Sequence, residues 1–267
     1  MFKTSRIRLA DIYLKQIMDR RLYSYCYQEI IEKFPTFENF KLSGHAMMNI
    51  NSPDEAVVYY EKALQEKEND PTVLRDLGRA LIQTHDYKKA NNYYLDSLEK
   101  LSKKDDSKGG SIYAFFDIAT DFSNLMLKLS AVDPKNNAIL KKRLEGFIDK
   151  LSQDSKNIDD WQLKKKLANF KCFLAKVQTK VYMENKTQNE GIVKEISRNL
   201  EEALKLSKDV YVKLRELQSE NMIKEEKENL SEICYQLGLF YENIDNRPEF
   251  AEKAYLEALN NLNTNEE

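Results

Sequence analysis

Three stretches of the chain repeat one order of small and large side chains with a period of 34 residues. The small positions are Ala10, Gly44 and Gly78, followed twelve residues later by Leu22, Ala56 and Ala90, and then by Cys26, Tyr60 and Tyr94. A fixed period of a few tens of residues is the sequence signature of stacked structural repeats. A helix–turn–helix unit of this length cannot bury its own apolar face, so each unit must stack on its neighbours.

The order small, aromatic, small in Ala56, Tyr60 and Ala63 has the spacing of the tetratricopeptide repeat. Only 7 glycines and 5 prolines occur in 267 residues, a composition typical of long helices with few turns. We therefore predict an all-α fold, a tetratricopeptide-repeat α-solenoid in which stacked antiparallel helix pairs follow a right-handed superhelix. The glycines are expected to let the two helices of each pair approach closely.

The repeat pattern divides the chain into four predicted segments. They are three regular tetratricopeptide repeats at 1–102, a linker with a degenerate repeat at 103–158, a long-helix repeat pair at 159–222, and a terminal repeat with a polar tail at 223–267. The long helix near 192–219 is expected to project beyond the stack, because it is about twice as long as a repeat helix. In the terminal repeat, the wider spacing from Gly238 to Ala251 predicts one extra residue in the turn.

Charge and cysteine usage exclude several classes of function. Lys and Arg number 42 and Asp and Glu 44, so the formal net charge of −2 lacks the basic excess of a nucleic-acid or anionic-membrane binder. No apolar run approaches the roughly 18 residues of a membrane span, so direct membrane insertion is not expected. No signal peptide is expected, because Met1–Lys15 carries charges among its apolar positions, and the three cysteines, Cys26, Cys172 and Cys234, are widely spaced. We expect a soluble, intracellular chain with reduced thiols buried in its core.

Motifs for catalysis or metal binding are absent from the sequence. His45 and His85 have no cysteine or carboxylate at ligand spacing, so a structural or surface role is expected for each. Acidic pairs such as Asp105-Asp106, Glu201-Glu202 and Glu225-Glu226 are expected to be solvated charges, because a catalytic dyad would need burial. We therefore predict that the chain is not an enzyme and uses no cofactor, metal or small-molecule substrate.

The first helix of each repeat is expected to line the concave wall of the solenoid. The predicted partner-binding groove consists of Asp11, Lys15, Lys41, His45, Asn49, Arg75, Arg79 and Gln83. A groove of mixed apolar and polar character suits an extended peptide or a helix of a partner protein. A clamp for the C-terminal carboxylate of a chaperone is not expected, because Thr72 and Asp76 stand at the clamp positions and Asp76 would repel a carboxylate.

Several stretches resemble a narrower family, the tetratricopeptide repeat protein 21 family. The resemblance lies in Arg8–Leu14, Leu22-Tyr23, Cys26-Tyr27, Met48–Ile50, Ala63-Leu64, Ala80–Tyr87, Asn92–Tyr94, Leu174–Val177, Glu232–Cys234 and Tyr255–Leu259. These residues are similar to an internal segment of the large repeat subunit of intraflagellar transport complex A. The resemblance is fainter over 103–160.

The resemblance implies a non-catalytic interaction scaffold in retrograde ciliary transport and cilium assembly. It further implies that the chain acts in the cytoplasm and the cilium or flagellum, with the β-propeller and repeat subunits of the same complex as partners. Family members are several times longer, so the chain is expected to be part of a longer solenoid. The alternative is a stand-alone cytosolic tetratricopeptide-repeat adaptor that binds a peptide or helix of a partner in its groove.

Overall fold

A computed structural model of the chain describes residues 1–67, 70–102, 110–155, 160–185 and 189–263. In these residues the chain forms twelve α-helices and one π-helical turn, and it has no strand. The predicted linker at 103–109, with the Asp105-Asp106 pair, and the end of the predicted tail at 264–267 lie outside the described residues. The all-α prediction is confirmed.

The chain divides into two compact units, Met1–Leu125 and Met126–Glu267. The helices of the first unit are α1 (Phe2–Ile12), the π-helical turn η1 (Tyr13–Ile17), α2 (Arg20–Lys33), α3 (Phe37–Asn49), α4 (Pro53–Glu66), α5 (Pro71–Gln83), α6 (Tyr87–Ser102) and most of α7 (Gly110–Val132). The remaining helices are α8 (Asn136–Ser155), α9 (Trp161–Asn185), α10 (Glu190–Glu216), α11 (Glu220–Asn243) and α12 (Pro248–Asn263).

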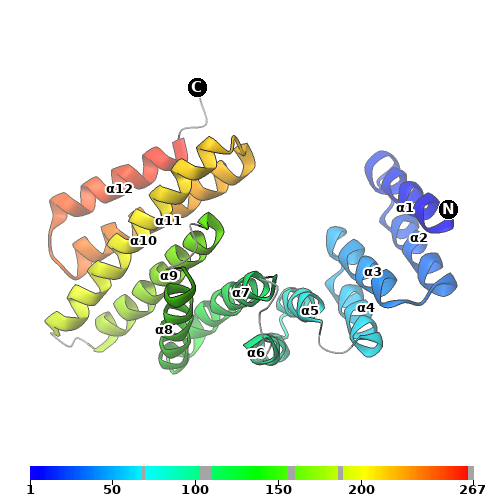
Figure 1. The fold of residues 1–267 in the computed structure, drawn as a ribbon, viewed down its shortest axis with the longest axis horizontal. Helices are drawn as coiled ribbons and strands as arrows, with labels where there is room; N and C mark the ends of the chain where they lie inside the picture. The colour runs from blue at the N-terminus through cyan, green and yellow to red at the C-terminus, as the bar shows by residue number, and fades with distance from the viewer. Residues whose placement is uncertain (68–69, 103–109, 156–159, 186–188, 264–267) are drawn as a thin grey trace. The chain divides into compact units, whose positions relative to one another are not determined.

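The first unit stacks its helices in antiparallel pairs, α1 with α2, α3 with α4 and α5 with α6 (Figure 1). Each second helix also contacts the first helix of the next pair, α2 against α3 and α4 against α5. The predicted stacking of helix pairs is therefore confirmed within this unit. The expected right-handed superhelix concerns the whole chain and stays a prediction, as does the division into four segments.

Each of the two most regular pairs is closed by a tyrosine ring that lies against a glycine. A Cβ atom on Gly44 would lie 2.4 Å from Cε1 of Tyr60, and one on Gly78 would lie 2.5 Å from Cε1 of Tyr94. Both rings are almost fully buried, at 1% and 0% exposure. The expected role of the glycines in close helix approach is confirmed, and the ring that uses the space is the aromatic residue of the same repeat.

The predicted equivalence of Leu22 with Ala56 and Ala90 is wrong. Ala56 is the fourth residue of α4 and Ala90 the fourth of α6, and both are fully buried. The fourth residue of α2 is Tyr23, which is 2% exposed, whereas Leu22 is 39% exposed. The same shift places Tyr27, rather than Cys26, at the position of the aromatic residue in the later repeats.

The π-helical turn accounts for this shift of one residue. A π-helical turn holds one more residue than a regular turn, and η1 lengthens the first helix accordingly. The link to α2 is then only Met18-Asp19, whereas three residues, Ile50–Ser52, join α3 to α4. The second helix of the first repeat therefore starts 33 residues before α4, although α4 starts 34 residues before α6.

The links between paired helices place one residue in the left-handed region. The φ values are 59° at Met18, 60° at Asn51, 63° at His85 and 55° at Asn246. A left-handed residue after the last helical turn commonly ends a helix and satisfies its free carbonyls. The predicted structural role of His85 in the turn of the third repeat is confirmed.

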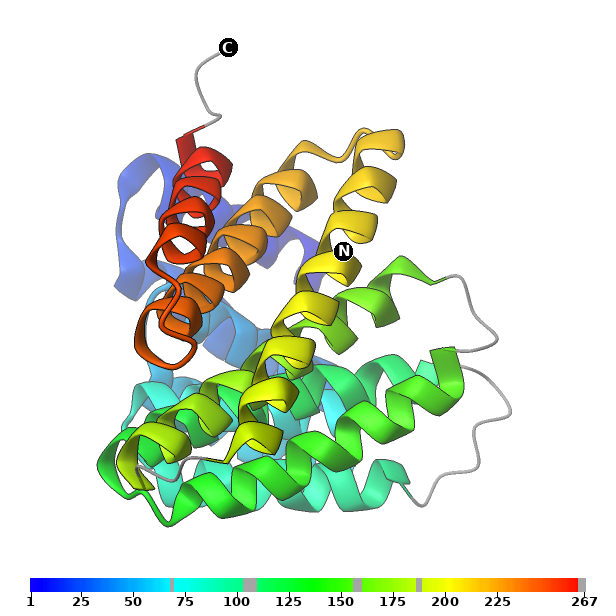
Figure 2. The ribbon, with the colours of Figure 1, turned by 90° about the vertical axis from the view of Figure 1, so that its left-hand side faces the viewer.

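The second unit contains three long helices of similar length. The helix α10 has 27 residues, and its neighbours α9 and α11 have 25 and 24. It lies beside both of them (Figure 2), and its buried stripe extends from Ile196 to Leu214. The expectation that this helix projects beyond the stack is wrong, because α9 and α11 are of similar length and both pack against it.

The last pair restores the pattern of the first unit. A Cβ atom on Gly238 would lie 2.3 Å from Cε1 of Tyr255. The link from α11 to α12 has four residues, Ile244–Arg247, against three in the second and third repeats. The predicted extra residue in this turn is confirmed.

All three cysteines are buried and carry free thiols, as predicted. Burial raises the pKa of both Cys172 and Cys234 to about 12. These thiols therefore pack as apolar core groups. In the described part of the chain, no helix combines the length and apolarity that crossing a bilayer requires.

Candidate functional site

The eight predicted groove residues lie on the first helices of the three repeats and form three rows along them. Residues 34 apart in sequence share a row. Row 1 contains Lys41 and Arg75, row 2 contains Asp11, His45 and Arg79, and row 3 contains Lys15, Asn49 and Gln83. All eight side chains are partly or largely exposed. We call the surface formed by these rows on η1, α1, α3 and α5 the first-helix wall.

Row 1 ties neighbouring first helices together. Lys41 Nζ on α3 donates a hydrogen bond of 2.7 Å to Thr72 Oγ1 on α5. Arg75 on α5 pairs at 3.4 Å with Asp76 of its own helix and at 3.4 Å with Asp117 on α7. These polar groups therefore serve mainly to hold the repeats together.

Row 2 makes the same kind of link one helical turn further on. His45 Nε2 on α3 lies 3.3 Å from Asp76 Oδ2 on α5. Arg79 on α5 donates two hydrogen bonds to Asp121 on α7, of 2.7 Å from Nε and 3.1 Å from Nη2. Burial acts to lower the pKa of Arg79, but the hydrogen bond and charge of Asp121 outweigh it and raise this pKa. A bidentate pair of this kind, with two hydrogen bonds between one guanidinium and one carboxylate, is the strongest form of an arginine–carboxylate ion pair.

The residues of row 3 do not link neighbouring helices through hydrogen bonds or ion pairs with described residues. The side chains of Lys15, Asn49 and Gln83 are exposed. None of the three makes a hydrogen bond or ion pair with a residue that the structure describes, although polar groups beside them in rows 1 and 2 do. The amides of Asn49 and Gln83 each offer two donors and one acceptor. Asp11 of row 2 is exposed in the same way and also makes no hydrogen bond or ion pair with a described residue. Row 3 and Asp11 are therefore the parts of the first-helix wall with polar groups available to a partner.

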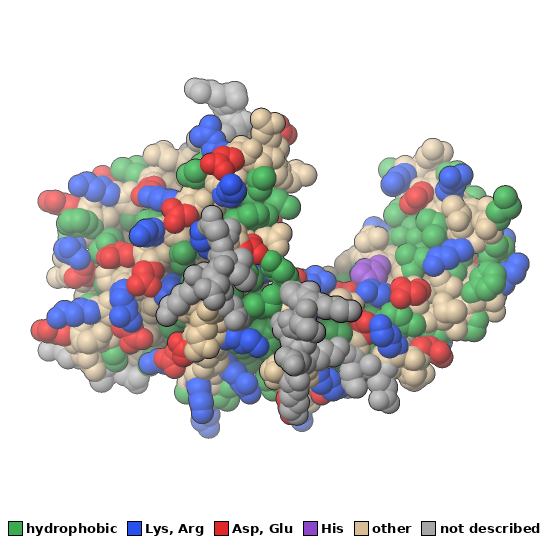
Figure 3. Space-filling view, in the orientation of Figure 1, with side chains coloured by type: hydrophobic (Ala, Val, Ile, Leu, Met, Phe, Trp, Pro, Cys, Tyr) green, Lys and Arg blue, Asp and Glu red, His purple; other side chains and the backbone are tan. Residues whose placement is uncertain are grey.

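The first-helix wall carries mixed charge rather than a patch of one sign. Asp76 is only 7% exposed and lies between His45 and Arg75, so this carboxylate forms part of the wall itself. On the face drawn in Figure 3, Lys and Arg side chains alternate with Asp and Glu. A mixed surface favours partners that are matched group by group over a uniformly charged polymer.

Two residues of this surface were missed in the sequence, Asp117 and Asp121 on α7. The sequence predicts α7 as an apolar helix of a degenerate repeat, so its polar residues are not expected to belong to the groove. The available signal is their spacing of four residues, which matches the spacing of Arg75 and Arg79 on α5. Matching i,i+4 pairs of opposite charge on adjacent first helices could have indicated the contact.

Among the described residues, no group of three or more His, Cys, Asp or Glu side chains is arranged to hold a metal ion. The expectation that the acidic pairs are solvated is wrong for Glu226. This residue on α11 is 0% exposed and accepts hydrogen bonds from Ser207 and Asn229. Its pair member Glu225 is largely exposed, with 66% of its side chain accessible. A helix turns about 100° per residue, so adjacent residues can face the core and the solvent.

A family model described as the fourth ARM domain of tetratricopeptide repeat protein 21 matches residues 73–259. Tetratricopeptide repeat protein 21B of Xenopus laevis is 31% identical over 253 residues, which cover 94% of this chain and 17% of the relative. The 21B protein of Mus musculus is 45% identical over 98 residues, or 37% of this chain and 8% of the relative. The chain thus spans less than a fifth of the length of these relatives.

Among solved structures, the chain is similar to MamA 41-end from Desulfovibrio magneticus RS-1. The TM-score is 0.51 at 13% sequence identity, and the match covers 86% of this chain and 97% of that chain. A likeness at this identity concerns the fold alone.

Proposed function

Because the chain belongs to the tetratricopeptide repeat protein 21 family, we propose that it is part of a non-catalytic interaction scaffold, a subunit of intraflagellar transport complex A. The proposed role is in retrograde ciliary transport and cilium assembly, in the cytoplasm and the cilium or flagellum. The proposed partners are the β-propeller and repeat subunits of that complex. The proposed role involves no nucleic acid, no direct membrane insertion and no small-molecule substrate.

The observation that carries a scaffold function is the contrast between the rows of the first-helix wall. In rows 1 and 2 the polar groups on α3 and α5 join α3, α5 and α7; they belong to Lys41, Arg75, His45 and Arg79. Row 3 presents Lys15, Asn49 and Gln83 on the same surface, exposed and with unused hydrogen-bonding groups. A rigid surface with a polar edge is suited to a protein partner, because little ordering entropy is lost when the partner binds.

Affinity purification from ciliated cells tests the proposed assembly. The chain carries an epitope tag and is expressed in these cells, and the proteins that co-purify are identified by mass spectrometry. The expected result is enrichment of complex A subunits over a tagged control of similar size. Recovery of the chain in soluble form without any of those subunits would contradict the proposal.

The alternative function is a stand-alone cytosolic adaptor, and the free amides of row 3 also support it. An adaptor would be a monodisperse monomer that binds one short peptide motif without other subunits. Sedimentation analysis and selection from a displayed peptide library test this function. Enrichment of one motif, combined with no complex A subunits in the purification, would favour the adaptor; no enriched motif would count against it.

A further inference from the structure

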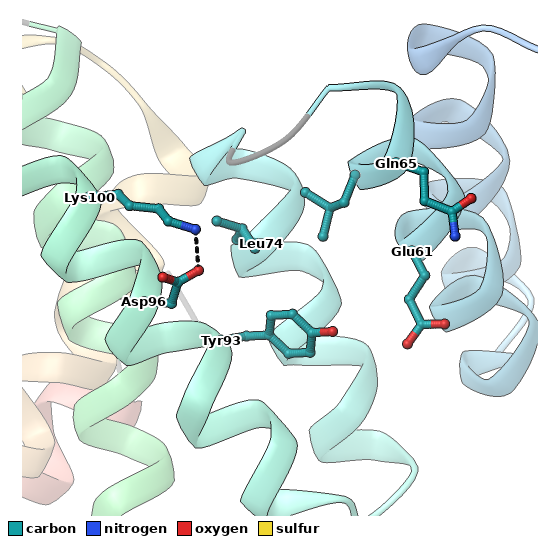
Figure 4. A pocket seen from close by; sticks show the side chains of 7 residues that line it. Glu61, Gln65, Leu74, Tyr93, Asp96 and Lys100 are labelled. Carbon is teal, nitrogen blue, oxygen red and sulfur yellow. Dashed lines mark hydrogen bonds and ion pairs between the residues drawn. The ribbon is translucent and has the colours of Figure 1, made fainter.

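A second concave feature lies away from the first-helix wall. It is a pocket of about 670 Å³ between α4 and α6, the second helices of the second and third repeats, and α5 contributes Leu74 to it (Figure 4). None of the residues that line it belongs to rows 1 to 3. A ligand bound in this pocket would therefore occupy a site separate from the first-helix wall.

The polar groups of this pocket come from two sides. Glu61 projects from α4, while Tyr93 and Asp96 project from α6 (Figure 4). Asp96 forms an ion pair with Lys100, one helical turn further along α6. Glu61 makes no ion pair with any residue in the described part of the chain. The pocket therefore holds two carboxylates against one ammonium group, an excess of one negative charge.

The negative charge of the pocket affects the pKa of the Tyr93 hydroxyl group. Burial raises the pKa of Tyr93, and the charges of Glu61 and Asp96 raise it further, while Lys89 acts in the opposite direction. Tyr93 is partly exposed and lines the pocket, so part of its phenol ring is available to a ligand there. Such a surface attracts a planar cation through its π-electrons.

The rest of the lining is apolar. Leu64 on α4 and Leu74 on α5 both contribute to the pocket wall. Leu74 is 3% exposed, so it forms a fixed surface rather than a mobile side chain. An apolar wall next to carboxylates suits a ligand with an aliphatic stem and a cationic head.

We propose that this pocket binds an arginine side chain of a partner protein. The guanidinium group pairs with Glu61 and lies against the ring of Tyr93, and the three methylene groups pack on Leu64 and Leu74. Arginine fits better than lysine, because its planar group donates hydrogen bonds in several directions and stacks on an aromatic ring. The protein nature of the ligand rests on the proposed scaffold function, but the site is separate from the first-helix wall.

The probe for this site is the blocked tripeptide acetyl-Ala-Arg-Ala-amide, added to the complete 267-residue chain with labelled leucine methyl groups. The matched probe replaces arginine by citrulline, which has the same shape without the charge. We expect a saturable shift of the Leu64 and Leu74 methyl resonances with arginine, and roughly fivefold weaker binding with citrulline, as for one partly exposed charge pair. Equal binding of both probes, or no shift with either, would overturn the proposal.

Two variants locate the charge that recognises the probe. Glu61→Gln keeps the size of the side chain and removes its charge, and we expect roughly fivefold weaker binding of the arginine probe. Glu66→Gln makes the same change on an exposed residue of α4 outside the pocket, and it should leave the affinity unchanged. An equal loss in both variants would contradict a specific pocket. Because the probe is tested on the purified chain, its failure is distinct from failure to recover complex A.

Discussion

At the scale of single residues, the glycine–tyrosine contacts determine how closely the paired helices approach. A glycine in a helix interior normally costs about 1 kcal/mol relative to alanine, so its presence needs a compensating gain. In this chain the gain is a tyrosine ring that lies where the Cβ atom would be. The contact recurs as Gly44 with Tyr60, Gly78 with Tyr94 and Gly238 with Tyr255.

The change Gly78→Ala tests this contact. The added methyl group would lie 2.5 Å from Cε1 of Tyr94. Overpacking of a fully buried ring costs about 2–3 kcal/mol, the upper part of the usual range, and this outweighs the gain of about 1 kcal/mol in helix propensity. We expect a lower free energy of unfolding in urea. Gly146→Ala on α8 is the control, because no atom lies within 4 Å of its added methyl group, and we expect it to stabilise the chain. Stabilisation by both changes would contradict the role of the tyrosine.

The buried carboxylate of Glu226 is a second residue-scale feature. Its Oε1 atom accepts hydrogen bonds from Ser207 on α10 and from Asn229, and Lys165 Nζ on α9 lies 3.6 Å from Oε2. Burial raises the pKa of Glu226 above its ordinary 4.5, and the hydrogen bonds and the lysine only partly offset this. The protonated carboxyl group is therefore favoured by folding.

The raised pKa of Glu226 has a defined effect on stability. The folded chain holds this proton more tightly than the unfolded chain, so the contribution is fully present below pH 4.5 and is lost as the pH rises through the folded-state pKa. We expect Glu226→Gln to remove this decline, measured as the difference in urea midpoint between variant and wild type from pH 4.5 upward. The exposed neighbour serves as control through Glu225→Gln. A pH-independent difference for Glu226→Gln would contradict the assignment.

At the scale of helices, polar side chains join the first helices across repeats. The pair of Arg79 on α5 with Asp121 on α7 is the best-formed link, with two hydrogen bonds. Asp121 is 17% accessible at its side chain and Arg79 48%, so solvent screens the pair only in part. Such a link should be worth more than a pair on an exposed helix surface.

A double-mutant cycle measures this link. Arg79→Gln, Asp121→Asn and the double variant should give a coupling energy of about 1 kcal/mol in urea unfolding. The pair Lys141 with Glu145 on α8, more than 40% exposed at both side chains, provides the comparison, with about 0.3–0.5 kcal/mol expected. A coupling for Arg79 and Asp121 no larger than that of the α8 pair would show that the link does not hold α5 to α7.

Helix positions could be predicted where local signals agree. The helices that follow Ser52-Pro53 and Asp70-Pro71 begin where proline in a first helical turn indicates, and Asp70 accepts hydrogen bonds from two backbone amides of that turn. The π-helical turn η1 at Tyr13–Ile17 has no such signal in the sequence. The one-residue shift of Leu22 and Tyr23 therefore became apparent only in the folded chain.

At the scale of the whole molecule, the repeat period predicts the fold, whereas contacts between repeats depend on residues far apart in sequence. The rows of the first-helix wall could be predicted, because they follow the period of 34. Their hydrogen bonds to Asp117 and Asp121 depart from this period, since the partners lie 42 residues apart, and only the matching four-residue spacing of the charges indicates them. The burial of Glu226 was missed for a similar reason, as it depends on packing among three long helices.

The central claim is that the first-helix wall binds protein partners through row 3. Asn49→Glu combined with Gln83→Glu places two carboxylates in row 3 without removing a hydrogen bond or ion pair to a described residue. Gln153→Glu combined with Asn92→Glu makes an equal charge change on the exposed surfaces of α8 and α6. Both variants should retain the helical content and thermal stability of the wild type, within the small effects typical of surface changes.

The most direct test is quantitative co-purification of partner proteins with these two variants and the wild type from ciliated cells. We predict that the row 3 variant recovers partners at a level lower by roughly fivefold, equivalent to about 1 kcal/mol of binding free energy, while the control recovers them at the wild-type level. Undiminished recovery with the row 3 variant, or an equal loss with the control, would contradict the claim that this surface holds the partners.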